Sequence, residues 1–212
     1  MEIAQLTEAV IVGNAPEAEA LTRTALDEGV APTAIVDEGL IVAMGIVGDR
    51  FGRGEIYVPE MLLSARAMQH ALAVVEPLLV GDDVSSRGSV VIGTVKGDIH
   101  AIGKNIVGIM LRGSGFTVLD LGVDVPADRF VGAIEEHRPD ILAMSALLTT
   151  TMPRMETVIE ALDCAGVRDE VKVMVGGAPI TEEFARSIGA DGYGRDAGAA
   201  AARARELVPV RA

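Results

Sequence analysis

The central stretch of the sequence reads Ser89-Val90-Val91-Ile92-Gly93-Thr94-Val95, followed by Lys96-Gly97-Asp98-Ile99-His100-Ala101-Ile102-Gly103. The first part is an apolar run rich in β-branched residues, which is typical of a buried strand. Apolar residues at helical spacing follow over residues 104–111. The stretch therefore predicts a strand, a loop and a helix. Glycines bracket the loop, so we expect unusual backbone angles or a close approach of the backbone to a ligand there.

Asp98 and His100 lie two residues apart in the predicted loop. At this spacing the carboxylate can reach one ring nitrogen of His100 and leave the other nitrogen free to bind a metal. The alternative is an ordinary hydrogen-bonded pair on the surface, which needs no ligand. The loop by itself leaves both interpretations open.

The rest of the carboxyl-terminal region repeats this alternation of strand and helix. Strands are predicted at residues 89–95, 116–121, 140–145, 171–175 and 191–193. Helices are predicted to begin near Lys104, Ala127, Pro153, Thr181 and Asp196. Such alternation forms parallel βαβ units. The expected fold class is α/β: a flavodoxin-like or Rossmann-like, doubly wound parallel sheet of five strands in the order 2-1-3-4-5.

In that strand order a ligand binds beyond the carboxyl ends of strands 1 and 3. Asp98 and His100 follow strand 1, and Ser145 ends strand 3, where the hydroxyl-rich segment 148–151 begins. Gly176-Gly177 follows strand 4 and would leave room for a flat or long ligand against the backbone. Each loop also has an ordinary explanation, as a helix cap or a tight turn. Together they predict a groove with the imidazole at its mouth.

Residues 1–81 show helical patterns alone and predict a four-helix bundle that forms a cap domain. The expected helices cover residues 2–12, run from the N-cap Asn14 to Gly29, begin at Pro32, and begin at Pro59. Residues 82–88 are interpreted as a linker, and residues 89–212 as the second domain.

The segment 48–58, between the third and fourth predicted helices, is too rich in glycine for a helix by its sequence. It carries Phe51 and Tyr57, although only 3% of the chain is aromatic. These side chains either fill the end of the bundle or cover a ligand held by the following domain.

Composition excludes several classes of function. The net charge of −13 argues against a nucleic-acid-binding surface. The single cysteine, Cys164, excludes an internal disulfide and is expected to be buried in a helix. His70, His137 and Cys164 are too scattered for a zinc site with His100. No signal peptide, membrane-spanning run or nucleotide-binding glycine motif is present, so a cytoplasmic location without membrane contact is expected.

Three pieces of the sequence, taken with their spacing, resemble one signature. They are Asp98-x-His100-x-x-Gly103, then after 41 residues Ser145-x-Leu147, then after 28 residues Gly176-Gly177. This pattern resembles the cobalamin-binding domains of methionine synthase and of the corrinoid proteins of methyltransferase systems. The resemblance covers nearly the whole chain, since that family also carries a four-helix cap. Residues 94–100 and 147–152 are most similar to the stand-alone corrinoid proteins.

The resemblance implies a cobalamin or related corrinoid as cofactor and a role for each matching residue. His100 would be the lower axial ligand of cobalt, with Asp98 hydrogen-bonded to it and Thr151 bonded to that aspartate. Phe51 and Val58 match cap positions that shield the methyl face. The implied cofactor-binding residues are Asp98, His100, Ile102, Gly103, Ser145, Leu147, Thr149, Thr151, Gly176, Gly177, Phe51 and Val58.

The implied function is that of a corrinoid carrier protein. It accepts a methyl group on cobalt from a substrate-specific methyltransferase and passes it to a second, methylcorrinoid:acceptor methyltransferase, with a reductive activase as a further partner. The chain would then be a non-catalytic, methyl-carrying subunit. A cobalamin-dependent sensor or regulatory module and a mutase subunit are the alternatives. Methanol, methylamines and methoxy-aromatic compounds all stay open as methyl donors.

Overall fold

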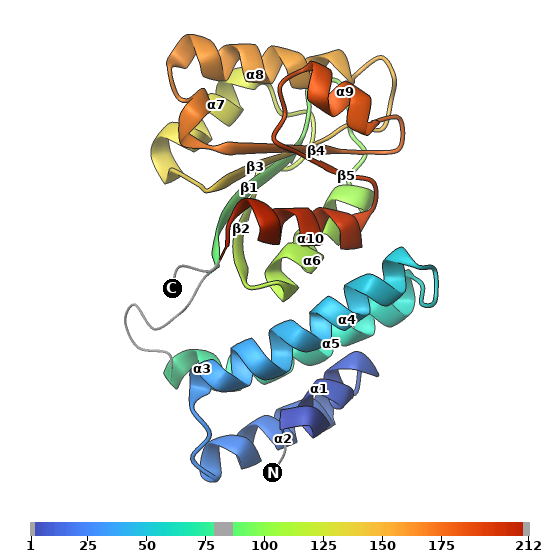
Figure 1. Cartoon of the computed structure of the whole chain (residues 1–212), viewed down its shortest axis with the longest axis vertical. Coiled ribbons are helices and arrows are strands. Elements are labelled where there is room, and N and C mark those ends of the chain that lie inside the picture. Colours follow the sequence, from blue (N-terminus) through green and yellow to red (C-terminus); the bar gives the residue numbers. More distant parts are fainter. Residues whose placement is uncertain (1–2, 79–86, 210–212) are drawn as a thin grey trace. The chain divides into compact units, whose positions relative to one another are not determined.

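The computed structural model describes residues 3–78 and 87–209 (Figure 1). These residues fall into two compact units: residues 3–78 with 113–115, and residues 87–112 with 116–209. We call them the helical unit and the sheet unit. Most of the predicted linker, residues 82–86, lies outside the described residues, and Gly88, its last residue, is the first residue of a strand.

The helical unit contains α1 (Ile3–Ile11), α2 (Ala15–Asp27), α3 (Pro32–Ala34), the π-helical segment η1 (Ile35–Leu40), α4 (Ile41–Gly52), α5 (Val58–Val75) and the short 3₁₀ helix η2 (Glu76–Leu78). The predicted N-cap of α2 is confirmed, because the Asn14 side chain accepts a hydrogen bond from the Glu17 N–H at 3.4 Å. The four longer helices, α1, α2, α4 and α5, each bury a mainly apolar set of residues, as a bundle requires.

The prediction of a loop from residue 48 is wrong, because α4 continues through Gly48 to Gly52. Gly48 is buried together with Met44 and Val47 on the same helix. Burial of this apolar stripe outweighs the cost of about 1 kcal/mol that a glycine imposes on a helix. Tyr57, in the short connection to α5, is 69% exposed and therefore does not fill the end of the bundle.

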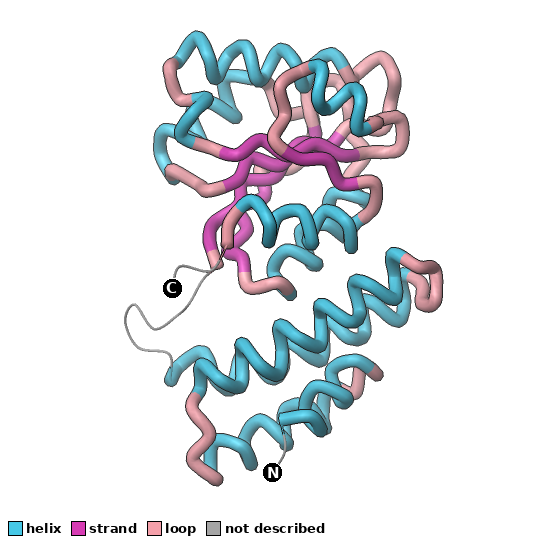
Figure 2. The backbone as a smooth tube through the Cα atoms, in the orientation of Figure 1, coloured by secondary structure: helices cyan, strands magenta, loops and turns pink. Residues whose placement is uncertain are grey.

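The sheet unit contains five described strands, which pair in parallel. Figure 2 shows them in magenta. They are β1 (Gly88–Thr94), β2 (Phe116–Asp120), β3 (Ile141–Ser145), β4 (Lys172–Gly176) and β5 (Gly192–Gly194). Their order is β2-β1-β3-β4-β5, which confirms the predicted topology. Pairing aligns Thr94 with Ser145, and Ser145 with Gly176. The carboxyl ends of the central strands therefore meet at one edge.

Helices cover both faces of this sheet (Figure 1). The helices are α6 (Ile102–Gly113), α7 (Ala127–His137), α8 (Pro153–Ala165), α9 (Glu182–Ser187) and α10 (Ala197–Leu207), with a short 3₁₀ turn at Arg168–Glu170. Val91 and Val95 pack with α7 and α8, whereas Val90 and Ile92 pack toward α6 and α10. This alternation along one strand explains why the run is apolar throughout.

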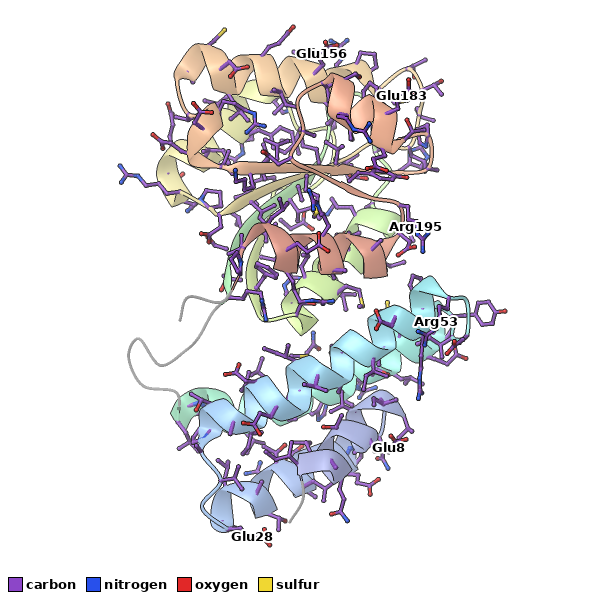
Figure 3. All side chains as sticks on the ribbon, viewed as in Figure 1. Glu8, Glu28, Arg53, Glu156, Glu183 and Arg195 are labelled. Atoms are coloured by element: carbon purple, nitrogen blue, oxygen red, sulfur yellow. The ribbon has the colours of Figure 1, made fainter. Side chains whose placement is uncertain are left out.

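The surface of the sheet unit is charged. Glu156 on α8 and Glu183 on α9 point away from the sheet (Figure 3). Cys164, expected to be buried, is exposed, because it lies on the side of α8 opposite the core residues Met155 and Leu162. No helix in the described part of the chain is both long enough and apolar enough to span a bilayer.

Candidate functional site

The loop between β1 and α6 holds Asp98 and His100 at the carboxyl edge of the sheet. Gly97 has a φ of +86°, which agrees with the expectation of unusual backbone angles there. The Thr94 hydroxyl donates a hydrogen bond to the backbone carbonyl of His100 at 2.9 Å. The loop is therefore tied back to the strand from which it leaves.

Asp98 and His100 form the predicted pair. Oδ1 of Asp98 accepts hydrogen bonds from the His100 backbone N–H at 3.0 Å and from His100 Nδ1 at 2.7 Å. Asp98 is 0% exposed, whereas the His100 side chain is 47% exposed. An ordinary surface pair would expose both groups, so the buried carboxylate favours the interpretation as a ligand-binding pair.

The other carboxylate oxygen of Asp98 is held by the segment after β3. Oδ2 accepts hydrogen bonds from the Leu147 N–H at 2.7 Å, the Leu148 N–H at 3.4 Å and the Thr151 hydroxyl at 2.9 Å. Burial alone would raise the pKa of Asp98. The N–H groups of Leu147 and His100, with the ring of His100 and the Thr151 hydroxyl, outweigh that effect and hold this pKa well below its usual range. Asp98 is consequently a carboxylate at neutral pH.

The charge of Asp98 decides the tautomer of His100. An ionised carboxylate only accepts hydrogen bonds, so the proton of the neutral ring must lie on Nδ1. Nε2 then carries the free lone pair, and among the described residues it has no hydrogen-bond partner. His100 is thus prepared to ligate a metal through Nε2.

Exposed apolar side chains lie next to His100 in the sequence and on the segment whose N–H groups bind Asp98. Ile102 is 80% exposed, and Ile99, Leu147 and Leu148 are also exposed. A cluster of apolar side chains in the open is typical of a binding surface. Within the described residues, no group of three or more His, Cys, Asp or Glu side chains could hold a metal ion. The loop offers one imidazole nitrogen and, next to it in the sequence, exposed apolar side chains.

The glycines predicted to line the groove differ in their surroundings. A Cβ atom at Gly103 would meet nothing within 4 Å, so this position leaves open space at the start of α6. A Cβ at Gly176 would lie 2.8 Å from the Gly194 carbonyl oxygen, and one at Gly177 1.8 Å from that of Ala146. Close neighbouring backbones are thus sufficient reason for Gly176 and Gly177, which the sequence analysis had explained by room for a ligand.

The structure brings together Asp98, His100, Leu147 and Thr151 by direct hydrogen bonds. Ser145 is half-buried at the end of β3, and Thr149 is exposed in the following turn. Phe51, in α4, and Val58, the first residue of α5, are half-buried in the helical unit. Their contribution to the site stays a prediction.

Two structural supports of the loop escaped the sequence analysis. Thr94 belongs to the predicted strand, and nothing in its local pattern shows that its hydroxyl reaches His100. Lys104 is buried and forms an ion pair with Asp120, and it donates a hydrogen bond to Asn105 at 2.9 Å. The sequence predicts Lys104 as a helix residue but not its burial, because burial of its ammonium group depends on β2 lying beside α6.

Comparison with known proteins identifies the class. Two models, each described as a B12 binding domain, match residues 88–202 and residues 2–76. The chain belongs to this family of B12-binding proteins. These matches, together with the relatives and solved structures described next, confirm four predictions. They are the family, the fold class, the corrinoid cofactor and the role as corrinoid protein of a methyltransferase system.

Among the relatives, the trimethylamine corrinoid protein of Methanosarcina barkeri is 43% identical over 210 residues, which cover 98% of this chain and 97% of that protein. The dimethylamine corrinoid protein of the same organism is 45% identical over 178 residues, 84% of each chain. Two solved structures have a TM-score of 0.84. A cobalamin-binding protein of Desulfitobacterium hafniense is 28% identical and covers 98% of this chain and 99% of its own. A chain of the methanol:cobalamin methyltransferase complex of Methanosarcina barkeri is 31% identical, and the match covers 97% of this chain and 79% of that chain.

Proposed function

We propose that this chain carries a methyl group between a methylamine-specific methyltransferase and a second methyltransferase, on a corrinoid ligated by His100. The observation that carries the assignment of the ligand is the buried, ionised Asp98, which fixes the proton of His100 on Nδ1 and leaves Nε2 accessible. The trimethylamine and dimethylamine corrinoid proteins among the relatives support methylamines as the donor class.

The residues present fit a corrinoid. They offer one imidazole nitrogen, exposed apolar side chains at Ile99 and Ile102, and open space at Gly103. A macrocycle holds its own metal, so the protein would need to provide only one further ligand, which would be His100. Apolar surface with a few placed polar groups is also the usual character of a cofactor site.

When bound, the corrinoid supplies the cobalt centre to which the methyl group is transferred. The chain supplies ligation and orientation. His100 Nε2 would hold the metal, while Asp98 holds the ring in one tautomer and one direction. Thr151 and the Leu147 N–H keep the carboxylate charged. A proton taken up at Nε2 would end ligation, so the pair can couple metal binding to proton transfer. Phe51 and Val58 would exclude water from the reactive face.

The partners follow from the same role. A carrier must meet a substrate-specific methyltransferase and a methylcorrinoid:acceptor methyltransferase, with a reductive activase as the third expected partner. The solved complex of a methanol:cobalamin methyltransferase, one chain of which is similar to this protein along nearly its whole length, supports a methyltransferase partner. No observation here favours a sensor or a mutase subunit.

The test of the ligand uses ¹⁵N-labelled protein and unlabelled cobalamin reduced to cobalt(II). Ligation by a protein nitrogen gives an electron paramagnetic resonance (EPR) spectrum with doublet splitting, whereas ligation by the cofactor's own base gives a triplet. We expect the doublet in the wild type and its loss in His100→Ala. His70→Ala is the matched control, because the His70 side chain is about as exposed as that of His100 but lies beside an exposed carboxylate, Glu19. A triplet in the wild type would refute the assignment.

The donor is tested separately. The cobalamin-loaded protein is first reduced chemically to the cobalt(I) state and then mixed with methyltransferases specific for trimethylamine, dimethylamine or methanol and the respective substrate. The visible spectrum reports methylation of the cofactor, and we expect methylation with one of the methylamine enzymes. Methylation by the methanol enzyme alone would refute the methylamine class and leave the carrier role intact.

A further inference from the structure

Asp124, in the connection between β2 and α7, has an unusual backbone conformation. Its φ is +54°, in the left-handed region that residues other than glycine rarely adopt. Among the described residues, Arg138 is the one other non-glycine with a positive φ, and it ends α7, where this conformation is common. Asp124 ends no helix, so its conformation needs another cause.

The contacts of Asp124 supply that cause. Its Oδ1 accepts a hydrogen bond from the Gly97 N–H at 2.7 Å, and its own N–H donates to the Asp98 carbonyl at 2.9 Å. One residue thus binds both ends of the Gly97–Asp98 dipeptide. Val125 continues the contact, since its N–H donates to the Thr94 carbonyl at 2.9 Å.

These bonds fix the backbone from which the Asp98 side chain projects. Asp98 in turn binds the ring of His100, and the Thr94 hydroxyl holds the carbonyl of the same residue. The loop is therefore held at Gly97 and Asp98 by Asp124, and at His100 by Thr94. A metal ligand must be held within about half an ångström of its working geometry, and such supports provide this precision.

We propose that Asp124 is a positioning residue that directs His100 toward the corrinoid through the backbone of Gly97 and Asp98. This inference rests on the proposed function, because it concerns the same imidazole. The hydrogen bonds of Asp124 go to the backbone of Gly97 and Asp98 and not to the His100 ring, so Asp124 acts through the loop between β1 and α6. In its left-handed conformation the Asp124 N–H reaches the Asp98 carbonyl while the Asp124 carboxylate reaches the Gly97 N–H.

Three variants separate the hydrogen bond from the backbone conformation. Asp124→Asn keeps an acceptor oxygen and tolerates a positive φ, so His100 ligation should stay as in the wild type. Asp124→Gly tolerates the φ without strain but has no acceptor for the Gly97 N–H. Asp124→Ser has a side chain one bond shorter and serves as a second variant should the glycine variant fail to fold.

The measured quantity is the ratio of protein-ligated to base-ligated cobalt(II), taken from the EPR spectra of ¹⁵N-labelled protein loaded with unlabelled cobalamin. Loss of an outer partner of a metal-binding histidine typically costs 10–100-fold in affinity, so we expect this ratio to fall about tenfold in Asp124→Gly. The asparagine variant should restore it.

The matched control removes a similar bond from the opposite edge of the sheet. Asp140, before β3, accepts a hydrogen bond from the Ser89 N–H at 2.7 Å. Asp140→Ala should lower the melting temperature and leave the ligation ratio unchanged. An unchanged ratio in Asp124→Gly, or an equal fall in Asp140→Ala, would overturn the proposal.

A second measurement does not depend on the corrinoid. In the cofactor-free protein, NMR of the imidazole nitrogens should show the Nδ1–H tautomer of His100 in the wild type and in Asp124→Asn, and a mixture in Asp124→Gly. If the wild type gives no EPR doublet while NMR shows this pattern, the ligation assignment fails and the positioning role stands. An unchanged tautomer in Asp124→Gly refutes the positioning role and leaves the ligation assignment intact.

Discussion

Two histidine–carboxylate pairs in this protein look alike in chemistry and differ in everything around them. His70 Nδ1 lies 3.5 Å from Glu19, and both side chains are exposed on the surface of the helical unit. His100 Nδ1 lies 2.7 Å from Asp98, whose carboxylate is fully buried and accepts three further hydrogen bonds from the segment 147–151. The comparison teaches that the tautomer and orientation of a histidine are fixed when its partner carboxylate is buried, charged and already held by other groups.

The Asp98→Ala substitution should have the largest effect. It leaves the Leu147 N–H without its acceptor, while the Thr151 hydroxyl still has the Leu148 carbonyl at 2.9 Å, so we expect a cost of about 1–3 kcal/mol of unfolding free energy. It also frees the ring of His100. Urea unfolding measures the loss of unfolding free energy. We also expect the EPR doublet to disappear. Glu19→Ala is the matched change at the other pair, and it should alter neither quantity. Equal effects of the two substitutions would remove the distinction.

Thr151→Val should have the next largest effect. Valine keeps the shape and removes the hydroxyl that donates to Asp98 Oδ2. We expect a loss of about 1 kcal/mol of unfolding free energy, and about a tenfold lower ratio of protein-ligated to base-ligated cobalt(II). Thr151→Ser keeps the hydroxyl and should behave as the wild type. If serine and valine have the same effect, the methyl group of Thr151, and not its hydroxyl, supports the site.

The pH dependence of stability sharpens the contrast further. The pKa of Asp98 is lower in the folded chain than in the unfolded chain, so its ionisation stabilises the fold above the unfolded pKa of about 4. This contribution is lost as the pH falls through the lower, folded pKa. The difference in unfolding free energy between wild type and Asp98→Asn should stay constant from about pH 8 to about pH 5 and shrink only in stronger acid. A difference that disappears by about pH 5 would contradict the lowered pKa.

Salt should give the smallest effect. The side chains of Arg23 and then His70 lower the pKa of Glu19, but all three groups lie open to solvent, where added salt screens them. Raising the salt concentration should therefore move the pKa of Glu19, measured by NMR, back toward its ordinary value. The bonds of buried Asp98 should resist the same change. A salt-sensitive Asp98 would show that water reaches that carboxylate.

The strand order and the location of the site could be predicted because they follow from local patterns. Alternating strand and helix periods specify parallel βαβ units, and those units place Asp98 and Ser145 at one edge of the sheet. The continuation of α4 through Gly48 could not be predicted in this way, since burial against neighbouring helices overrode the low helix propensity of glycine. Exposure of Cys164 likewise depended on which side of α8 faces the core.

The sequence by itself determined that Asp98 can reach His100, because two residues in a loop are close in any fold. Only the tertiary structure decided that Asp98 is buried and stays charged in that contact. The second oxygen of Asp98 meets Leu147 and Thr151, 49 and 53 residues further along the chain, and Gly97 meets Asp124 from another connection. Sequence patterns record local periodicity and short reach. The hydrogen bonds that keep a buried carboxylate charged come from segments that are neighbours only because their parallel strands pair.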